Sequence, residues 1–349
     1  MCKFKDVCST STGNKNTQDK IDDGIYPFYV RSQTVERINS WTFDGEAILT
    51  AGDGVGVGKV FHHTYGKIGV HQRVYILSNF KCDANYLFHF FSSHFYNRVK
   101  RMSAKNSVDS VRKEMITEMP LYLPSKQEQT KIGVLLSLLD ERISTQNKII
   151  DRLQSLIKGI VDCTILRKEK NAIVGDVCSI SEQIKAEANI DDIITVRLHG
   201  NGVCKSSAEN LQLGATQYFR RRAGQLIYGK QNFHNGAIGI VPKSLDNGIT
   251  SKDIPSFDIY DVNCNSAYLL AQLQSPQYYK PAEALTTGTG SKRLKEETFL
   301  KMPIVLPNKR EQDNIAILIY RISINLDQAK KMLDLFSIQK QYLLRQMFI

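Results

Sequence analysis

The chain has 349 residues, of which 42% are hydrophobic and 23% charged, and its formal net charge is +11 at pH 7. This composition is ordinary for a folded globular protein with room for two domains, and it excludes disordered and collagen-like chains. No apolar run is as long as a membrane span, and the polar N-terminus, MCKFKDVCSTSTG, does not resemble a secretory signal. We therefore expect a cytoplasmic protein whose positive charge favours a polyanionic partner such as nucleic acid.

Residues 1–124 predict a mixed α/β domain. After a polar opening, strand-like segments at residues 26–30 and 46–50 are separated by turn signals. A helix is expected over residues 84–100, and its aromatic stripe, at Leu87, Phe88, Phe91 and Phe95, is interpreted as core.

A glycine-rich stretch, GDGVGVGK at residues 52–59, resembles a nucleotide-binding loop at first sight. A phosphate loop would need Gly in place of Asp53 and Ser or Thr in place of Val60, and no helix pattern follows it. We interpret the stretch as a hairpin or as a loop that approaches another backbone closely. The seven cysteines lack zinc-ligand spacing, and no catalytic constellation is recognisable, so we expect no metal site and no catalysis.

A long helix is predicted over residues 125–168. It begins after Pro124 with a capping box, in which the side chains of Ser125 and Glu128 bind each other's backbone N–H groups. Its apolar residues recur at alternating spacings of four and three, as in a coiled-coil seam. The seam residues are Ile132, Leu136, Leu139, Ile143, Ile150 and Leu153.

Residues 169–307 predict a second mixed α/β domain, with strands at 193–198, 225–228 and 236–241 and a helix at 266–274. A second long helix follows over residues 308–349. Its lead-in, Met302-Pro303, repeats Met119-Pro120 at an offset of 183 residues, and Asn308 replaces Ser125 as the cap. Its seam residues are Ile315, Ile319, Ile322, Leu326, Leu333 and Phe336.

The repeat defines the expected fold class. The motif DVCS, at residues 6–9, returns at residues 176–179, so the two halves share a beginning as well as an end. An apolar face about 40 residues long, or roughly 60 Å at 1.5 Å per residue, exceeds one small domain. We therefore expect an α+β protein in which two mixed α/β domains are joined by two repeated helices that pack together, with an internal pseudo-two-fold repeat.

Basic and polar side chains cluster in both predicted domains. Arg, Gln, Asn and His side chains have the donor geometry that DNA base edges and phosphates require, although each cluster taken alone also fits a solvated surface. The candidate DNA-binding residues are Tyr29, Arg31, Ser32, Lys59, His71, Gln72, Arg73 and Lys105 in the first domain, and Arg197, His199, Arg220, Arg221, Arg222, Lys230, Gln231, Asn232, Lys292 and Arg293 in the second.

Taken together, these segments resemble the specificity (S) subunits of type I restriction-modification systems. The resemblance rests on ILTAGDGVGVGK with the following GKIGVHQRVYIL, on VRLHGNGV and GAIGIVPKSLDNGITSKDIPSF in the second half, and above all on the twice-used MP..LP.K.EQ lead-in to a long helix. It covers nearly the whole chain. The first recognition domain is shorter than the second, so contacts do not transfer residue by residue between the halves.

The resemblance implies two target-recognition domains, each reading one half of a bipartite DNA site, and two helices that pack antiparallel and hold them apart. It implies two modification (methyltransferase) subunits as partners that use S-adenosylmethionine, and restriction subunits that use ATP, with neither cofactor bound by this chain. The chain itself would be non-catalytic. The alternatives are a freestanding two-domain DNA-binding regulator, a structural coiled-coil protein, and a nucleotide-using enzyme built on the glycine-rich stretch. Neither the target bases nor the spacer length can be read from the sequence.

Overall fold

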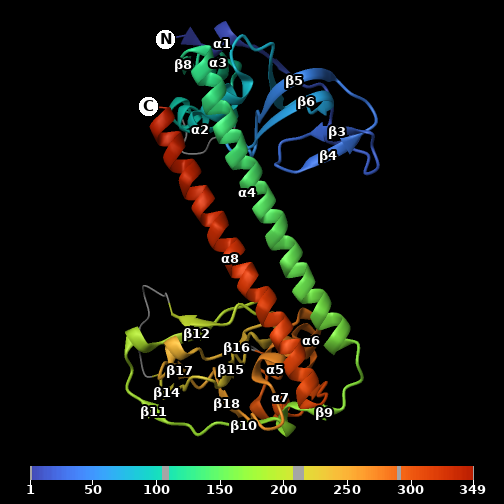
Figure 1. Cartoon of the computed structure of the whole chain (residues 1–349), viewed down its shortest axis with the longest axis vertical. Coiled ribbons are helices and arrows are strands. Elements are labelled where there is room, and N and C mark those ends of the chain that lie inside the picture. Colours follow the sequence, from blue (N-terminus) through green and yellow to red (C-terminus); the bar gives the residue numbers. More distant parts are fainter. Residues whose placement is uncertain (1, 104–109, 207–215, 289–291, 349) are drawn as a thin grey trace. The chain divides into compact units, whose positions relative to one another are not determined.

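The computed structural model describes residues 2–103, 110–206, 216–288 and 292–348 (Figure 1). Its contacts divide the chain into two units, of which unit 1 comprises Met1–Asn147 with Lys331–Ile349 and unit 2 comprises Lys148–Lys330. Each unit therefore holds one globular part and one half of each long helix. The predicted α+β architecture, with two mixed domains and two repeated helices, is confirmed.

Unit 1 is built on a six-stranded sheet with strand order β2-β7-β5-β6-β3-β4. Neighbouring strands are antiparallel except for β3 and β6, which are parallel. The expected segments at 26–30 and 46–50 lie in β3 and β5. The strands are β2 (Ser9–Thr12), β3 (Tyr26–Tyr29), β4 (Val35–Ile38), β5 (Phe43–Ala51), β6 (Phe61–Val70) and β7 (Val74–Ser78), and a separate pair joins β1 (Cys2–Lys3) to β8 (Pro120–Leu121).

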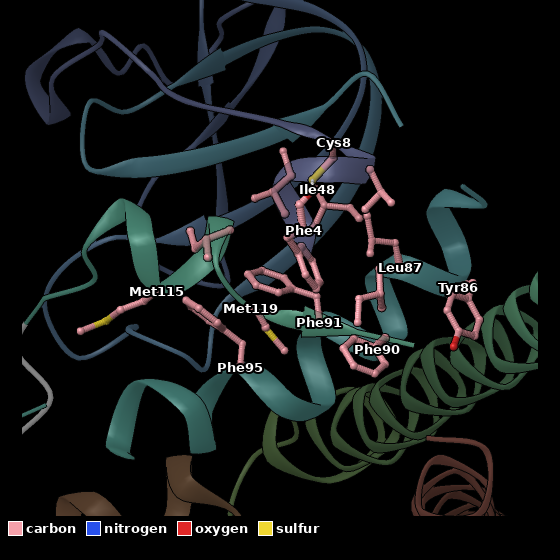
Figure 2. Close-up of a cluster of buried hydrophobic side chains, with 14 of the residues drawn as sticks. Phe4, Cys8, Ile48, Tyr86, Leu87, Phe90, Phe91, Phe95, Met115 and Met119 are labelled. Atoms are coloured by element: carbon pink, nitrogen blue, oxygen red, sulfur yellow. Dashed lines mark hydrogen bonds between the residues drawn. The ribbon is translucent and has the colours of Figure 1, made fainter. Parts of the chain in front are cut away.

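The core of unit 1 is aromatic (Figure 2). Helix α2 (Ala84–Met102) buries Leu87, Phe91 and Phe95 completely, as the sequence predicted, whereas Phe88 is half-buried. The ring of Phe91 lies 5.3 Å from that of Phe4 in α1 (Phe4–Val7). A third helix, α3 (Lys113–Thr117), adds Met115 to this cluster. The aromatic stripe is therefore occupied in packing and is not a platform for base stacking.

Unit 2 divides its strands among smaller sheets. Four strands form a sheet of order β10-β18-β15-β16, three form β11-β14-β17, and two pairs join β12 to β13 and β9 to β19. The strands are β9 (Ala172–Ile173), β10 (Cys178–Ile180), β11 (Lys185–Ala186), β12 (Ile194–Val196), β13 (Val203–Lys205), β14 (Tyr218–Arg220), β15 (Leu226–Tyr228), β16 (Ile238–Ile240), β17 (Ile249–Ser251), β18 (Ser256–Ile259) and β19 (Pro303–Ile304), with helices α5 (Ser266–Leu273), α6 (Pro276–Tyr279) and α7 (Glu296–Leu300).

The long helices are α4 (Lys126–Val161), extended by a π-helical turn over Asp162–Leu166, and α8 (Lys309–Met347). The capping box is confirmed, because the Ser125 backbone N–H donates to Glu128 at 3.0 Å and the Glu128 N–H donates to the Ser125 hydroxyl at 3.3 Å. Asn308 caps α8 by accepting from the Glu311 N–H at 3.0 Å. Within the described residues, no helix is both long and apolar enough to span a lipid bilayer.

The predicted seam is the protected face of both helices. In unit 1, Leu136 and Leu139 of α4 are buried, and Asp140 pairs with Lys340 of α8. In unit 2, Val161 and Ile165 pack with Ile315 of α8. The first half of α4 thus meets the second half of α8 in unit 1, and the reverse holds in unit 2. This is the antiparallel pairing that the resemblance to S subunits implied.

Each long helix is attached to its domain by a buried glutamine of the lead-in motif. The Gln129 side chain donates to the carbonyl of Pro124 at 2.8 Å and accepts from the N–H of Asp83, the N-cap of α2, at 3.1 Å. Gln312 repeats this by donating to Pro307 at 2.8 Å and accepting at 2.8 Å from Asn265, the N-cap of α5. In α4 the Glu-Gln pair of the motif therefore caps the helix through Glu128 and joins it to its domain through Gln129, and Gln312 repeats the second role in α8.

Candidate nucleic-acid interface

The turn between β6 and β7 brings three predicted DNA-binding residues together in unit 1. His71 is only 4% exposed, and its Nδ1 accepts the backbone N–H of Arg73 at 3.0 Å, so the neutral ring carries its proton on Nε2, 3.3 Å from the Thr17 hydroxyl. Burial, reinforced by the charge of Arg31, holds the pKa of His71 below its usual value. His71 therefore shapes the turn, while the exposed Gln72 and Arg73 extend from it.

Asp53 gathers the cationic side chains around this turn. Its Oδ1 accepts from Nη1 of Arg31 at 2.9 Å, and its Oδ2 lies 3.7 Å from Nε of Arg73. The three residues come from the loop after β5, the segment after β3 and the turn before β7. The Asp53 side chain is 26% exposed, whereas those of Arg31 and Arg73 are 45% and 65% exposed. The acid is thus enclosed by two guanidinium groups that still face solvent.

The glycine-rich loop makes this convergence possible. A Cβ added at Gly56 would lie 2.4 Å from the backbone carbonyl of Arg31, so only glycine permits the loop to pass that segment. Gly54 and Gly58 have φ angles of 75° and 65°, in the left-handed region. The stretch joins β5 to β6 as a hairpin, and its close approach to another backbone confirms the interpretation made from the sequence.

The backbone around Asp53 is repeated in unit 2. In unit 1 the N–H of Gly52 donates to the carbonyl of Arg73, and the N–H of Val111 donates to that of Gly52, both at 2.7 Å. In unit 2 the backbone N–H of Lys230 donates to the backbone carbonyl of Asp253, and the N–H of Leu294 donates to the carbonyl of Lys230, both at 2.9 Å. Val111 and Leu294 are 183 residues apart, as are the helices. We call these paired sites the three-segment rims: residues 52–53, 73 and 110–111 in unit 1, and residues 230, 253 and 293–294 in unit 2.

The charges on the two rims differ although the backbones agree. In unit 2, Asp253 stands where unit 1 has Arg73, and it lies 3.3 Å from Nη1 of Arg293. Lys230, whose side chain is 12% exposed, pairs with Glu296 of α7 at 2.7 Å. In unit 1 the frame and the neighbouring Arg31 therefore present two arginines around one acid, whereas unit 2 presents two separate ion pairs. Two surfaces of this kind have different chemical preferences.

The first 155 residues, which include the whole rim of unit 1, match the family model described as "Type I restriction modification DNA specificity domain". This part of the chain therefore resembles a DNA specificity domain of type I restriction-modification systems. A stretch of 153 residues is also 27% identical to the specificity subunit of the type I restriction enzyme EcoDI from Escherichia coli. That match covers 44% of this chain and 34% of the relative, so the chain matches about a third of the relative's length.

The fold likeness extends beyond these first 155 residues. Over 99% of this chain and 95% of the other, the structure resembles the S subunit of a type I restriction-modification system from M. genitalium, with a TM-score of 0.73 and 13% sequence identity. It also matches the HsdS subunit from Thermoanaerobacter tengcongensis over 99% and 95% of the two chains, with a TM-score of 0.41 and 13% identity. The first of these two likenesses, with its TM-score of 0.73, shows that the chain has the fold of an S subunit in both units, at a sequence identity too low to carry over individual residues.

Other predicted residues of unit 1 lie away from the rim contacts. Tyr29 is a core residue whose hydroxyl donates to Thr64 at 2.8 Å. Ser32 is exposed and bonds locally to the carbonyl of Thr34. Lys59 is exposed and lies over the ring of Tyr96 in α2. Lys105 falls outside the described residues.

Unit 2 disperses its remaining candidates. Gln231 and Asn232 are exposed beside Lys230, next to the rim, and Lys292 precedes it with an ion pair to Glu283 at 3.3 Å. Arg197 donates to Cys204 at 3.0 Å, and Arg222 pairs with Asp258 at 3.9 Å. Arg220 is exposed on β14. His199 lies elsewhere, at the wall of a pocket of about 610 Å³ that Ile157 of α4, Ala271 of α5 and Tyr320 of α8 also line.

Arg221 is fully buried and is not available to a ligand in this structure. Its guanidinium donates to the hydroxyls of Thr250 at 2.8 Å and Ser256 at 3.0 Å, to Gln183 at 3.3 Å, and to the carbonyl of Ile254 at 3.0 Å. Burial lowers the pKa of Arg221 to about 10. These bonds tie β17 and β18 to the turn that carries Asp253, so Arg221 supports the unit 2 rim from the interior.

Arg221→Lys should therefore destabilise the protein by about 2 kcal/mol, because an ammonium cannot reproduce four bonds from a planar fork. Chemical denaturation of the two proteins measures the difference. Arg220→Lys, one residue earlier and exposed, is the matched control and should change stability by less than about 0.5 kcal/mol. Equal stabilities for all three proteins would contradict the supporting role of Arg221.

Asp53, Asp253 and Glu296 are the site residues that the sequence reasoning missed. In the sequence, Asp53 stands out only as a departure from the phosphate-loop pattern, and no pattern links Asp253 or Glu296 to the basic clusters. The available signal was the 183-residue offset, which connects Val111 to Leu294 and so marks the same frame in both halves.

Proposed function

We propose that this chain is the DNA-recognition subunit of a type I restriction-modification enzyme and that each three-segment rim reads one half of a bipartite DNA target. The observation that carries the proposal is the repeated rim, in which backbone bonds recur while side chains diverge. A repeated frame places two reading surfaces equivalently in two domains, and divergent side chains let the two half-sites differ in sequence.

The proposal includes the partners and the cellular setting. Two modification subunits, which use S-adenosylmethionine for adenine methylation, and restriction subunits, which use ATP, would assemble with this non-catalytic chain in the cytoplasm. The net charge of +11 supports contact with the DNA backbone, which attracts basic surfaces regardless of sequence. The exposed apolar residues of the long helices, such as Leu138, Ile317 and Leu335, offer protein contact area.

The direct test is to express the chain with the modification subunits of its own system and to map methylated adenines across a host genome. The expected result is methylation at one bipartite site with two fixed half-sites and a fixed gap. Tight, selective DNA binding by the chain alone, with no methylation in the presence of the modification subunits, would instead favour a freestanding regulator.

The two rims should read their half-sites independently. Arg73→Ala should relax preference in one half-site and Arg293→Ala in the other, at about 1 to 3 kcal/mol for a lost base contact. Binding titrations on duplexes with one half-site scrambled at a time measure this. Lys81→Ala and Lys301→Ala remove exposed cations outside either rim and serve as controls. If either rim variant alters both half-sites equally, the assignment of one half-site to each unit is wrong.

Helix length should set the gap between the half-sites. Removing one heptad from each helix, residues 146–152 and the equivalent residues 329–335, keeps both seams in register and shortens each helix by about 10 Å. The expected result is a methylated site with unchanged half-sites and a gap about three base pairs shorter, since base pairs are about 3.4 Å apart. Methylation at the original gap would refute the role of the helices as a spacer.

A further inference from the structure

We propose that Asp53 is a positioning residue that holds Arg31 and Arg73 for recognition of guanine in the half-site read by unit 1. This inference rests on the proposed function and deepens it, because it names the base that the rim selects and a residue that fixes the selection.

A carboxylate such as that of Asp53 is unfavourable on a surface that reads DNA. It repels phosphates, and an exposed ion pair contributes only about 0 to 1 kcal/mol to folding stability. The Arg31 and Arg73 side chains remain 45% and 65% exposed, so Asp53 does not bury them in the core. Its effect is instead on geometry, because it fixes two long side chains that would otherwise sample many rotamers.

The contacts leave a pair of donors on each arginine. Asp53 engages Nη1 of Arg31, so the edge formed by Nε and Nη2 lies on the other side of that guanidinium. It lies near Nε of Arg73, so the edge formed by Nη1 and Nη2 is the outer one. A two-donor guanidinium edge matches the O6 and N7 acceptors of guanine in the major groove. The arrangement therefore suits one or two guanines and offers no acceptor–donor pair for adenine on these side chains.

The backbone supports this geometry from all three segments. The Gly52 N–H binds the Arg73 carbonyl at 2.7 Å, the Arg73 N–H binds His71, and Gly56 packs against the Arg31 carbonyl. The Cα positions of all three residues are thus fixed before any ligand arrives. Preorganised donors lose less conformational entropy on binding, which sharpens discrimination between bases.

Asp53→Asn keeps the shape of the side chain but removes the two ion pairs that hold Arg31 and Arg73. With the modification subunits present, the variant should bind DNA as tightly as wild type or tighter, because the rim becomes more positive. Its discrimination should fall by about tenfold at the guanines that Arg31 and Arg73 read, measured by replacing each G·C pair of the half-site in turn with A·T. Arg31→Lys and Arg73→Lys should lose discrimination at the same positions, because an ammonium cannot bind guanine with a planar fork.

Glu36→Gln is the matched control. Glu36 is also a partly exposed acid of the unit 1 sheet in an ion pair, 2.9 Å from Lys20, and it lies on β4 away from the rim. The control should leave discrimination unchanged at every position. Melting temperatures of all variants establish that each is folded.

Full discrimination by Asp53→Asn at every G·C pair would overturn the proposal. A loss of discrimination confined to A·T pairs, or spread over both half-sites, would overturn it too. In each of these cases the wild-type complex still recognises its site, so the proposed function itself stands. A wild-type complex with no sequence preference would instead reject the proposed function itself.

Discussion

Leu136→Asp should cost about 4 kcal/mol or more of folding stability and is expected to give the largest loss of any single substitution considered. Leu136 is fully buried in the aromatic core of unit 1, in the same cluster as Phe348, the residue that follows α8. An aspartate there would be desolvated without a partner in a closely packed apolar cluster. Chemical denaturation, or loss of soluble protein on expression, would register the effect.

The control for this experiment lies two residues along the same helix. Leu138 is 51% exposed, so Leu138→Asp introduces the same charge on the opposite face and should change stability by less than about 0.5 kcal/mol. If both variants were equally stable, the face at Leu136 would not be the buried seam. A loss of modification-subunit binding by Leu138→Asp alone, at normal stability, would mark the exposed face as a protein contact.

The second large effect is a loss of stability as the pH falls from about 6.5 to 4, centred on His89. This histidine of α2 is 1% exposed, and its Nε2 lies 3.2 Å from the hydroxyl of Ser137. Its Nδ1 is 3.8 Å from Asp140, which also pairs with Lys340 of α8. Burial lowers the pKa of His89 to about 4, against the opposing attraction of Asp140.

The direction of the effect follows from which state binds the proton. In the unfolded chain His89 binds a proton below its unfolded pKa of about 6.5, whereas in the folded protein it binds one only near pH 4. The free energy of unfolding therefore falls as the pH drops across this range. A difference of about 2.5 units corresponds to about 3 kcal/mol. His71, whose pKa burial also lowers, adds to the loss in the same direction.

Stability curves at pH 7 and pH 4.5 for wild type and His89→Gln test this prediction. Glutamine keeps a donor for Ser137 but does not titrate, so the variant should show a clearly smaller loss between the two values. An identical pH response in His89→Gln and wild type would show that another group governs acid sensitivity.

Unit 2 has no such charge at the corresponding place. Aligning the N-caps of α2 and α5 places Ala271 at the position of His89. The 183-residue offset places Ser323 at that of Asp140 and Ile157 at that of Lys340, and Ala271, Ser323 and Ile157 all line the pocket of about 610 Å³. The junction between the long helices and the domain is thus repeated in both units. In unit 1 a buried polar cluster occupies it, and in unit 2 it holds a largely apolar cavity. Acid sensitivity is therefore expected from unit 1.

The sequence by itself determined the features that depend on local or periodic chemistry. The capping box at Ser125, the seam on both long helices and the core position of Phe91 all follow from spacing and side-chain type, because each is set by contacts within a helix or along one face. The 183-residue repeat likewise predicted that the two helices pack together, and the resemblance to S subunits implied that they do so antiparallel. The type of each domain, mixed α/β, came from alternating strand and helix patterns.

Only the tertiary structure decided which polar residues share a site. Arg31, Asp53 and Arg73 lie on three separate loops and meet at one site. The neighbouring sequence does not distinguish these two arginines from Arg221, which is buried in the core of unit 2. A guanidinium group is stable either in solvent or in the interior where hydrogen-bond acceptors surround it. Whether an arginine is buried therefore depends on strands and turns, distant in the sequence, that supply those acceptors. The reading surface is therefore a property of loop convergence, which the close approach of Gly56 to Arg31 allows and which no single segment encodes.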